Sequence, residues 1–249
     1  MEQSNRQLQQ AVTQLEKIDK TKSDFISVAS HELRTPLTVM RGYNEMLLED
    51  PAINGNPFHS KLIKGIYSGI MRLHEIVNSM LDMASIDTRS LELKVESVSL
   101  SGLVKTVCDS FNDSFQERGL ELEIENLRDL PPIDGDPEAL KKVFYHLVIN
   151  AIKYTPDGGR ITITGVSVSP GQMNLPEGGV EVIVADTGIG IHLEYQELIF
   201  TKFYQTGELA LHSTGKTKFK GAGPGLGLAI ARGIVDAHRG RIWAESPGH

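Results

Sequence analysis

The apolar residues of the first fifty positions recur at alternating intervals of three and four, which is the heptad pattern of a long coiled-coil helix. The polar Lys22 interrupts a seam that otherwise consists of Leu8, Ala11, Leu15, Ile18, Phe25 and Ala29. Pro51 and the sequence Asn-Gly-Asn-Pro at 54–57 then predict a loop. A second helix is expected after it, with one face formed by Leu62, Ile66, Ile70, Leu73, Val77 and Leu81. Two amphipathic helices cannot bury both apolar stripes alone, so the pattern predicts that two hairpins pair as a four-helix bundle and that the protein is a homodimer.

From Leu91 the apolar positions change to a period of two, which predicts a strand over 91–96. We expect helices at about 101–118, from Asp136-Pro137 and from Gly225, with Asp136 as an N-cap and Pro137 as the first helical residue. Further strands are expected at 120–124, 160–168, 180–185 and 241–244. The mixture predicts an α/β sandwich with helices on one face of a largely antiparallel sheet. Few apolar residues and many Gly, Ser, Thr and Lys residues between 205 and 220 predict a lid-type loop.

Composition narrows the possible functions. The chain has 249 residues, 40% of them hydrophobic, which is enough for one or two packed domains. A formal net charge of −7 argues against nucleic acid as a partner. The single cysteine, Cys108, excludes an intrachain disulfide and a cysteine-based zinc site. No run approaches the roughly 18 apolar residues that cross a bilayer. We therefore expect a cytoplasmic segment without membrane contact, within a protein that could still be membrane-anchored elsewhere.

The first helix carries a candidate nucleophile. At 100° per residue, His31 lies opposite the apolar stripe that contains Leu33 and Leu37, and should therefore be exposed. A neutral imidazole in water can act as a nucleophile near pH 7, and the adjacent Glu32 could accept its proton or hold its tautomer. Pro36 removes a helical N–H and should bend the helix, at a cost of about 3 kcal/mol. The alternative is a surface histidine beside an incidental bend.

The helix that Asp136 opens carries a polar stripe, because His146, Asn150 and Lys153 follow one another at i, i+4 and i+7. An amide oxygen suits Mg²⁺ and a lysine neutralises phosphate, so the stripe suits a phosphate-and-metal face. The alternative is an ordinary solvated face.

Two glycine segments favour the phosphate-and-metal face. Asp186-Thr187-Gly188-Ile189-Gly190 follows a predicted strand, where the carboxylate could accept a hydrogen bond from an exocyclic amine. Glycines at 221, 223, 225 and 227 precede a helix whose first N–H groups favour phosphate.

Taken in this order, the segments resemble the catalytic core of a sensor histidine kinase of two-component signalling. Ser30 to Pro36 resembles the H box of that family. The segments 146–155, 186–191, 200–204 and 223–228 resemble its N, G1, F and G2 boxes, respectively. The resemblance implies a coiled-coil signalling helix over 1–20, a dimerisation and histidine-phosphotransfer domain over 21–90, and an ATP-binding domain of the Bergerat type over 91–249. It implies autophosphorylation from Mg²⁺-bound ATP and phosphotransfer to an aspartate of a response regulator, with phosphatase activity as a further possibility.

The resemblance also implies individual roles. His31 would be the phosphoacceptor, Glu32 its acid/base partner, and Thr35 the residue that positions water during dephosphorylation of the regulator. Asn150 would hold Mg²⁺ and Asp186 would contact adenine. The rest of the ATP site would comprise His146, Lys153, Tyr154, Gly188, Gly190, Ile191, Phe203, Gly223, Gly225, Leu226 and Gly227. Partners would be a second copy, a receiver domain and an upstream sensor module.

The sequence departs from the family pattern at several positions. His146 stands where Asn is usual, and Gln205 stands where a basic residue is common, so Lys216, Lys218 or Lys220 could neutralise charge instead. Pro224 replaces a common Thr. The sequence stops at His249, before the last strand that the family normally carries after Trp243, so we expect either a truncated fragment or a differently built edge.

Two other functions stay open. A chaperone-like ATPase of the same superfamily explains the pocket but not the His31 segment, and a non-catalytic dimeric scaffold explains the departures.

Overall fold

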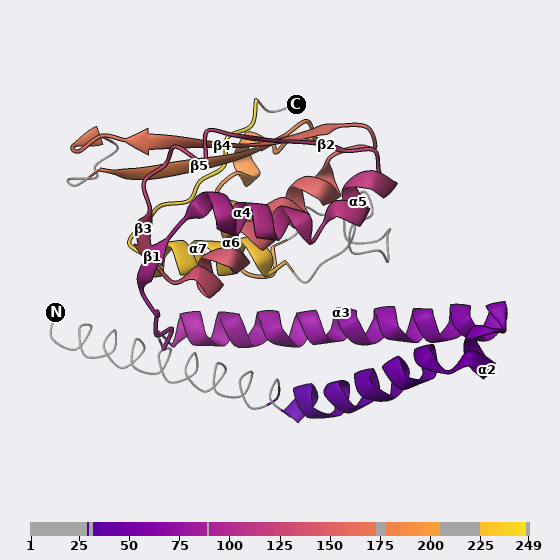
Figure 1. Cartoon of the computed structure of the whole chain (residues 1–249). Coiled ribbons are helices and arrows are strands. Elements are labelled where there is room, and N and C mark those ends of the chain that lie inside the picture. Colours follow the sequence, from indigo (N-terminus) through magenta and orange to yellow (C-terminus); the bar gives the residue numbers. More distant parts are fainter. Residues whose placement is uncertain (1–28, 30–31, 89, 173–177, 205–224, 248–249) are drawn as a thin grey trace, which may run out of the picture. The chain divides into compact units, whose positions relative to one another are not determined.

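The computed structural model describes residues 29, 32–88, 90–172, 178–204 and 225–247, and they form two compact units, Met1–Leu91 and Glu92–His249. In the first unit, residues 32–49 are helical and are followed by the short helix α2 (Pro51–Asn54) and the long helix α3 (Pro57–Asp87) (Figure 1). The loop predicted over 51–57 thus contains one helical turn. Asn56 caps α3, because its side-chain oxygen accepts the N–H of Phe58 at 3.0 Å, and Pro57 occupies the first turn, where its missing N–H costs nothing.

The helical hairpin has a small core of its own. Leu37 packs with Ile70 and Val77 of α3, and Asn44 is only 3% exposed and donates to the Ile63 carbonyl at 3.3 Å. Most of the predicted stripes remain exposed, namely Leu33, Met40, Leu47, Leu62, Ile66 and Leu73. The hairpin therefore leaves apolar surface that one chain does not bury. His31 and the coiled coil predicted upstream of it lie outside the described residues.

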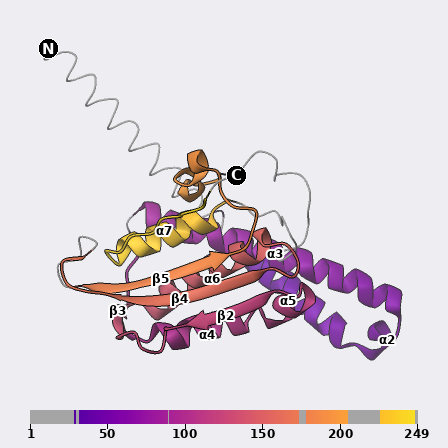
Figure 2. The same ribbon diagram turned by 90° about the horizontal axis from the view of Figure 1, so that it is seen from above.

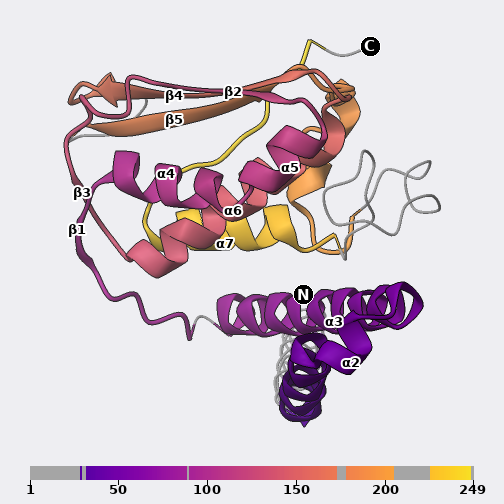
Figure 3. The ribbon, with the colours of Figure 1, turned by 45° about the vertical axis from the view of Figure 1, so that its right-hand side comes forward.

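The second unit is a three-stranded sheet with helices packed on one face (Figure 3). The strand order is β2 (Glu121–Glu125), β4 (Arg160–Val168), β5 (Gly179–Asp186), as Figure 2 shows from above. A separate pair joins β1 (Glu96–Val98) to β3 (Ile133–Gly135). The remaining elements are α4 (Leu100–Asp109), α5 (Asn112–Glu117), α6 (Pro137–Tyr154), α7 (Gly227–Ala237) and the 3₁₀ turns η2 (Leu193–Tyr195) and η3 (Leu198–Phe200).

Helix α6 organises the core of this unit. It begins as predicted, with Asp136 accepting the N–H of Ala139 at 2.9 Å and Pro137 in the first turn. Its apolar residues, among them Phe144, Val148 and Ile152, pack against Ile161 and Ile163 of β4 in one buried cluster. Since α6 also packs against α7 and β5, its polar face is held at a fixed position between them.

Four details of the prediction were wrong. The main sheet is not largely antiparallel: β4 pairs with β5 antiparallel but with β2 parallel, because α6 lies between β2 and β4 in the chain and allows a crossover connection. The strand expected at 91–96 overlaps the observed one only at its end: residues 91–95 form no strand, and β1 starts at Glu96, where β3 provides a partner. The expected helix 101–118 breaks into α4 and α5. Residues 241–244 form no strand.

The lone cysteine, Cys108 on α4, should be unreactive in the folded protein. Its side chain is 2% exposed, and burial, followed by the charge of Asp109, raises the pKa of the thiol to about 11. A shift from 9.0 to about 11 leaves roughly a hundredfold less thiolate near neutral pH. We expect no labelling by a disulfide-exchange reagent at pH 7.5 and one equivalent of label after unfolding in guanidinium. Labelling of the native chain at the rate of a free thiol would contradict the packing of α4.

Candidate functional site

The polar stripe of α6 is half-buried and lies within the second unit. His146, Asn150 and Lys153 each retain partial exposure, whereas Val148, Ile149 and Ile152 between them are buried in the core. A freely solvated helix face would leave the three polar side chains fully exposed. Their partial burial indicates that other segments of the unit approach this face.

One of these segments is the loop that follows β5. The N–H of Thr187 donates to the Arg160 carbonyl at 3.0 Å, and the Thr187 hydroxyl accepts the N–H of Arg160 at 2.9 Å. Two residues later the N–H of Ile189 donates to the Tyr154 carbonyl at 3.1 Å. The loop is thus attached on one side to the start of β4 and on the other to the last residue of α6.

Glycine is required at position 188 because the backbone and a carboxylate crowd it. A Cβ atom there would lie 2.4 Å from Oδ1 of Asp186 and 2.6 Å from the Tyr154 carbonyl oxygen. Such distances are well inside van der Waals contact. Gly190 serves a different purpose, since its φ of 71° lies in the left-handed region that favours glycine. Both glycines proposed from the sequence are therefore needed for the course of this loop.

The carboxylate of Asp186 is held by its own loop. Its Oδ1 accepts the N–H of Gly188 at 2.8 Å, while no described residue donates to its second oxygen. Burial of the carboxyl group raises the pKa of Asp186, and the hydrogen bond from Gly188 opposes that rise. An oriented acceptor beside α6, with one oxygen available, can recognise a donor such as an amine.

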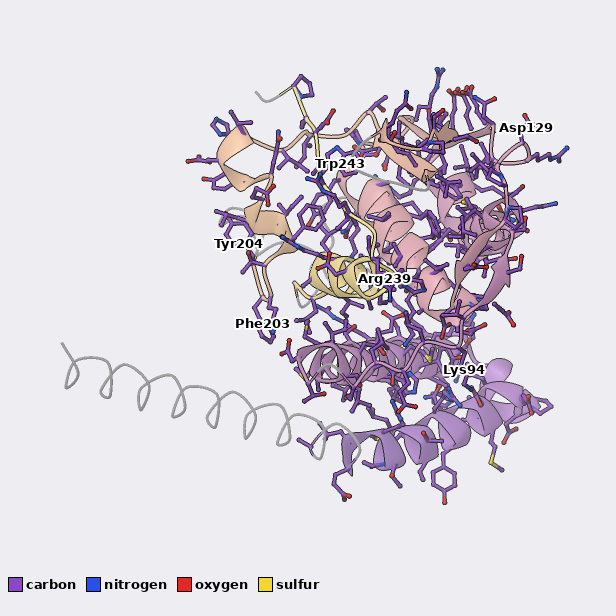
Figure 4. All side chains as sticks on the ribbon, turned by 90° about the vertical axis from the view of Figure 1, so that its left-hand side faces the viewer. Lys94, Asp129, Phe203, Tyr204, Arg239 and Trp243 are labelled. Atoms are coloured by element: carbon purple, nitrogen blue, oxygen red, sulfur yellow. The ribbon has the colours of Figure 1, made fainter. Side chains whose placement is uncertain are left out.

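The start of α7 packs against the segment that ends at Tyr204. Gly225 has a φ of 69°, and its carbonyl accepts the N–H of Phe203 at 2.8 Å. Phe203 itself has a φ of 60° and is half-exposed, with its ring directed away from the segment that also carries Tyr204 (Figure 4). No side chain of the described residues caps the N-terminus of α7, and the first N–H groups of a helix favour an anion.

His146 and Gly227 are neighbours across the site. A Cβ at position 227 would lie 2.9 Å from Nδ1 of His146, so the imidazole occupies the space beside the first turn of α7. Leu226 is fully buried and anchors that turn in the core. His146 therefore lies next to the N-terminal end of α7.

The side chains of this site determine which metal ion it could hold. Within the described ranges, no three His, Cys, Asp or Glu side chains converge on a possible metal position. Asn150 offers an amide oxygen on the half-buried face of α6. Mg²⁺ commonly takes one or two protein ligands and completes its shell with phosphates and water, so this site fits Mg²⁺ only together with a phosphate ligand.

The structure brings most of the predicted residues together in the second unit. Tyr154 of α6 contacts Gly188 and Ile189, and His146 of the same helix lies beside Gly227. Phe203 packs against Gly225 at the start of α7, and Asn150 and Lys153 lie on α6 between His146 and Tyr154. Gly223 and His31 lie outside the described residues. Glu32 and Thr35 belong to the other unit, where both are exposed on the first helix.

Sequence reasoning missed the residues that support this site from behind. Thr155 is fully buried and its hydroxyl donates to the Ala151 carbonyl at 2.6 Å. Arg118 contacts the same end of α6 from the end of α5. The sequence placed Thr155 at the end of the segment 146–155 that resembles the N box, but gave it no role of its own. Nothing in the local sequence indicated Arg118, because its partners lie more than thirty residues away.

Comparison with known proteins gives two family models that match separate parts of the chain. Residues 21–89 match the His Kinase A (phospho-acceptor) domain, and residues 135–249 match the histidine kinase-, DNA gyrase B-, and HSP90-like ATPase. Among the described residues, no helix has the length and apolar character needed to cross a membrane.

Similar curated proteins are sensor histidine kinases. TmoS of Ectopseudomonas mendocina is 33% identical over 98% of this chain, and WalK of Bacillus subtilis is 31% identical over 94%. The chain spans only 24% of the length of TmoS and 36% of WalK.

Two solved structures are similar over most of the chain. Full-length ShkA in complex with AMPPNP has 25% sequence identity and a TM-score of 0.70, and covers 90% of this chain and 43% of its own. Histidine kinase ThkA in complex with the response regulator TrrA has 25% identity and a TM-score of 0.54, and covers 89% and 57%.

We expect Gly188→Ala to lower the stability of the second unit by about 1–3 kcal/mol, because the added methyl overlaps the Asp186 carboxylate and the Tyr154 carbonyl. Urea unfolding followed by the fluorescence of Trp243, the single tryptophan of the chain, reports on this unit. Gly102→Ala in α4 is the matched control. Nothing lies within 4 Å of its added Cβ, so it should stabilise by about 0.4–1 kcal/mol. Equal midpoints for the two variants would contradict the close approach at Gly188.

Proposed function

Because this chain belongs to the histidine kinases, we propose that it transfers the γ-phosphoryl group of ATP to its own His31 and then to an aspartate of a response regulator. The observation that carries the proposal is the pairing of two features on one chain. One compact unit holds the ordered site around Asn150 and Asp186, and the other presents the exposed helical residues Glu32 and Thr35 directly after His31.

In this proposal the nucleotide lies on the polar face of α6. The Asp186 carboxylate accepts a hydrogen bond from the 6-amino group of adenine, and the hydrogen bond from Gly188 fixes its orientation. Lys153 and the uncapped first turn of α7 neutralise phosphate charge. Asn150 holds Mg²⁺ together with the phosphates, and the ion when bound offsets the negative charge that develops on the transferred group.

The transfer to His31 is a direct displacement. A ring nitrogen of His31 forms a bond to the γ-phosphorus, the bond from that phosphorus to the bridging oxygen breaks, and ADP leaves. Glu32 accepts the ring proton, and both Glu32 and Thr35 are exposed, which supports access to a nucleotide and to water. The reaction requires the two units to approach each other, so the segment near 88–98 must permit movement between them.

Partners follow from the same scheme. The exposed apolar stripes of the hairpin, including Leu33 and Ile66, provide the surface that a second copy would cover in a four-helix bundle. A receiver domain would accept the phosphoryl group, as the complex of ThkA with TrrA supports. We also propose an upstream sensor module and a cytoplasmic location. The chain would further act as a phosphatase of the regulator, with the assistance of Thr35. No nucleic acid takes part.

Labelling with [γ-³²P]ATP tests the phosphoacceptor. The wild-type chain should acquire protein-bound phosphate that is stable in base and lost in acid, as phosphohistidine is. His31→Gln should abolish the label but keep ATP binding, whereas His59→Gln, which removes an exposed histidine of the same unit, should leave the label unchanged. Asn150→Ala should lose binding of Mg²⁺-bound ATP.

The other outcomes of the labelling identify the alternatives. Acid-labile label that persists on the His31→Gln chain would refute the assignment of His31. ATP hydrolysis without bound phosphate would indicate a chaperone-like ATPase, and absence of both would indicate a scaffold.

The charge of Asp186 gives a second prediction. A raised pKa in the folded state means that the favourable contribution of this group is complete below the usual Asp pKa and is lost as the pH rises through the raised value. Asp186→Asn should therefore be more stable than the wild type at pH 7, with the difference disappearing near pH 3.5. The variant should bind ADP at least about tenfold more weakly, because Asn has only one side-chain oxygen. The N–H of Gly188 engages that oxygen, and the NH₂ donor group then takes the place of the second carboxylate oxygen.

Calorimetric titration with ADP and thermal unfolding at both pH values measure these two effects. Asp129→Asn removes the same charge from an exposed loop far from Tyr204 (Figure 4) and should change neither the ADP affinity nor the stability. A destabilised Asp186→Asn protein with unchanged ADP affinity would be incompatible with the proposed role.

A further inference from the structure

We propose that Arg118 is a positioning residue of the nucleotide site, and that its guanidinium fixes the last turn of α6, which supports the loop that contacts adenine. The inference rests on the proposed function, since it concerns the same site. Arg118 lies outside every motif of the sequence, at the end of α5, and its own carbonyl accepts the N–H of Gly158 at 3.0 Å.

The side chain of Arg118 is nearly buried and uses all three of its nitrogens. It is 9% exposed. One terminal nitrogen donates to the Ile152 carbonyl, the other to the Thr155 carbonyl at 2.6 Å, and Nε to a carboxylate oxygen of Asp157 at 2.7 Å. The last carbonyls of a helix have no helical partner, so this planar group satisfies two acceptors that would otherwise be buried and unpaired. Its positive charge also favours the C-terminal end of a helix dipole.

The two anchored carbonyls flank the residue on which the adenine loop rests. Tyr154 lies between Ile152 and Thr155 in the chain, and its own carbonyl accepts the N–H of Ile189 at 3.1 Å. The same carbonyl is the atom that leaves no room for a side chain at Gly188. Displacement of this turn would therefore displace the loop, and with it the carboxylate of Asp186.

A second connection runs through the turn after α6. A Cβ on Gly159 would lie 2.4 Å from the Thr155 methyl group and 2.9 Å from the Thr187 hydroxyl, so these residues are in close contact. Thr187 in turn makes two hydrogen bonds to the backbone of Arg160: its N–H donates to the Arg160 carbonyl, and its hydroxyl accepts the Arg160 N–H. Arg118 holds the Thr155 carbonyl in place. A shift of Thr155 would therefore move Thr187 near the start of the loop 186–191, in addition to Ile189, which rests on Tyr154.

The ion pair with Asp157 is not the important contact. The Asp157 side chain is 75% exposed, and an exposed ion pair contributes little because water and salt screen it. The bonds to the two carbonyls are shielded and have no substitute among the described residues. Loss of the guanidinium should therefore have a larger effect than loss of its carboxylate partner.

Affinities for ADP and IDP, measured by calorimetry on the full chain, test the inference. IDP has an oxygen in place of the 6-amino group, so the ratio of the two affinities reports the contact with Asp186. We expect Arg118→Met to weaken ADP binding at least about tenfold and IDP binding much less, so that the preference for ADP falls by a similar factor. Arg118→Lys, which keeps the charge but offers one compact donor group, should fall between the wild type and Arg118→Met.

Two controls separate positioning from general damage. Asp157→Asn removes the ion pair alone, and Arg128→Met removes an exposed arginine of the same unit, and both should keep the wild-type preference for ADP. Circular dichroism and Trp243 fluorescence establish which variants are folded. A folded Arg118→Met protein with an unchanged ratio would overturn the inference.

If Arg118→Met does not fold, Arg118→Lys decides the question, and an unchanged ratio in that variant would equally overturn the inference. A wild-type chain that binds ADP and IDP equally would instead contradict the proposed role of Asp186. The failure of the inference and the failure of the proposed function therefore give different results.

Discussion

The site depends on the backbone at the end of α6, where the carbonyl of Tyr154 accepts the N–H of Ile189 at 3.1 Å. This helix must bury one face in the core, present Asn150 and Lys153 on another, and end where a loop can rest on it. A helix end leaves carbonyls without partners, and here they are used rather than exposed. One accepts the N–H of Ile189 in the loop after β5, and two accept Arg118, so the requirement to satisfy buried acceptors also fixes the position of that loop.

The two units satisfy the hydrophobic requirement in different ways. The second unit closes a core between β4, α4 and α6, and a polar site can therefore be held rigidly at its edge. The hairpin buries only a few residues, and it encloses Asn44, whose side-chain oxygen has no hydrogen-bond partner among the described residues. The proposed function requires the phosphoacceptor to meet both the second unit and a partner protein, and a well-packed unit joined to an incompletely buried hairpin fits that requirement.

How much the sequence predicted depends on whether the deciding contact is local. The N-cap at Asp136 and the extent of β4 follow from neighbouring residues, and these predictions were confirmed. The parallel pairing of β2 with β4 depends on the path of the chain through α6, and periodicity does not report that path. The roles of Arg118 and of the contact between His146 and Gly227 depend on partners distant in sequence, and no local pattern encodes them.

The central claim is that a nucleotide lies on the polar face of α6, between the loop after β5 and the start of α7. Backbone amide NMR of the chain titrated with ADP and Mg²⁺ tests it most directly. The account predicts that the largest shifts fall on residues 150–155, 186–191 and 225–227, while Thr162 and Thr164 of β4 keep their resonances. Shifts confined to the exposed face of the sheet, or a spectrum unchanged at saturating ADP, would contradict it.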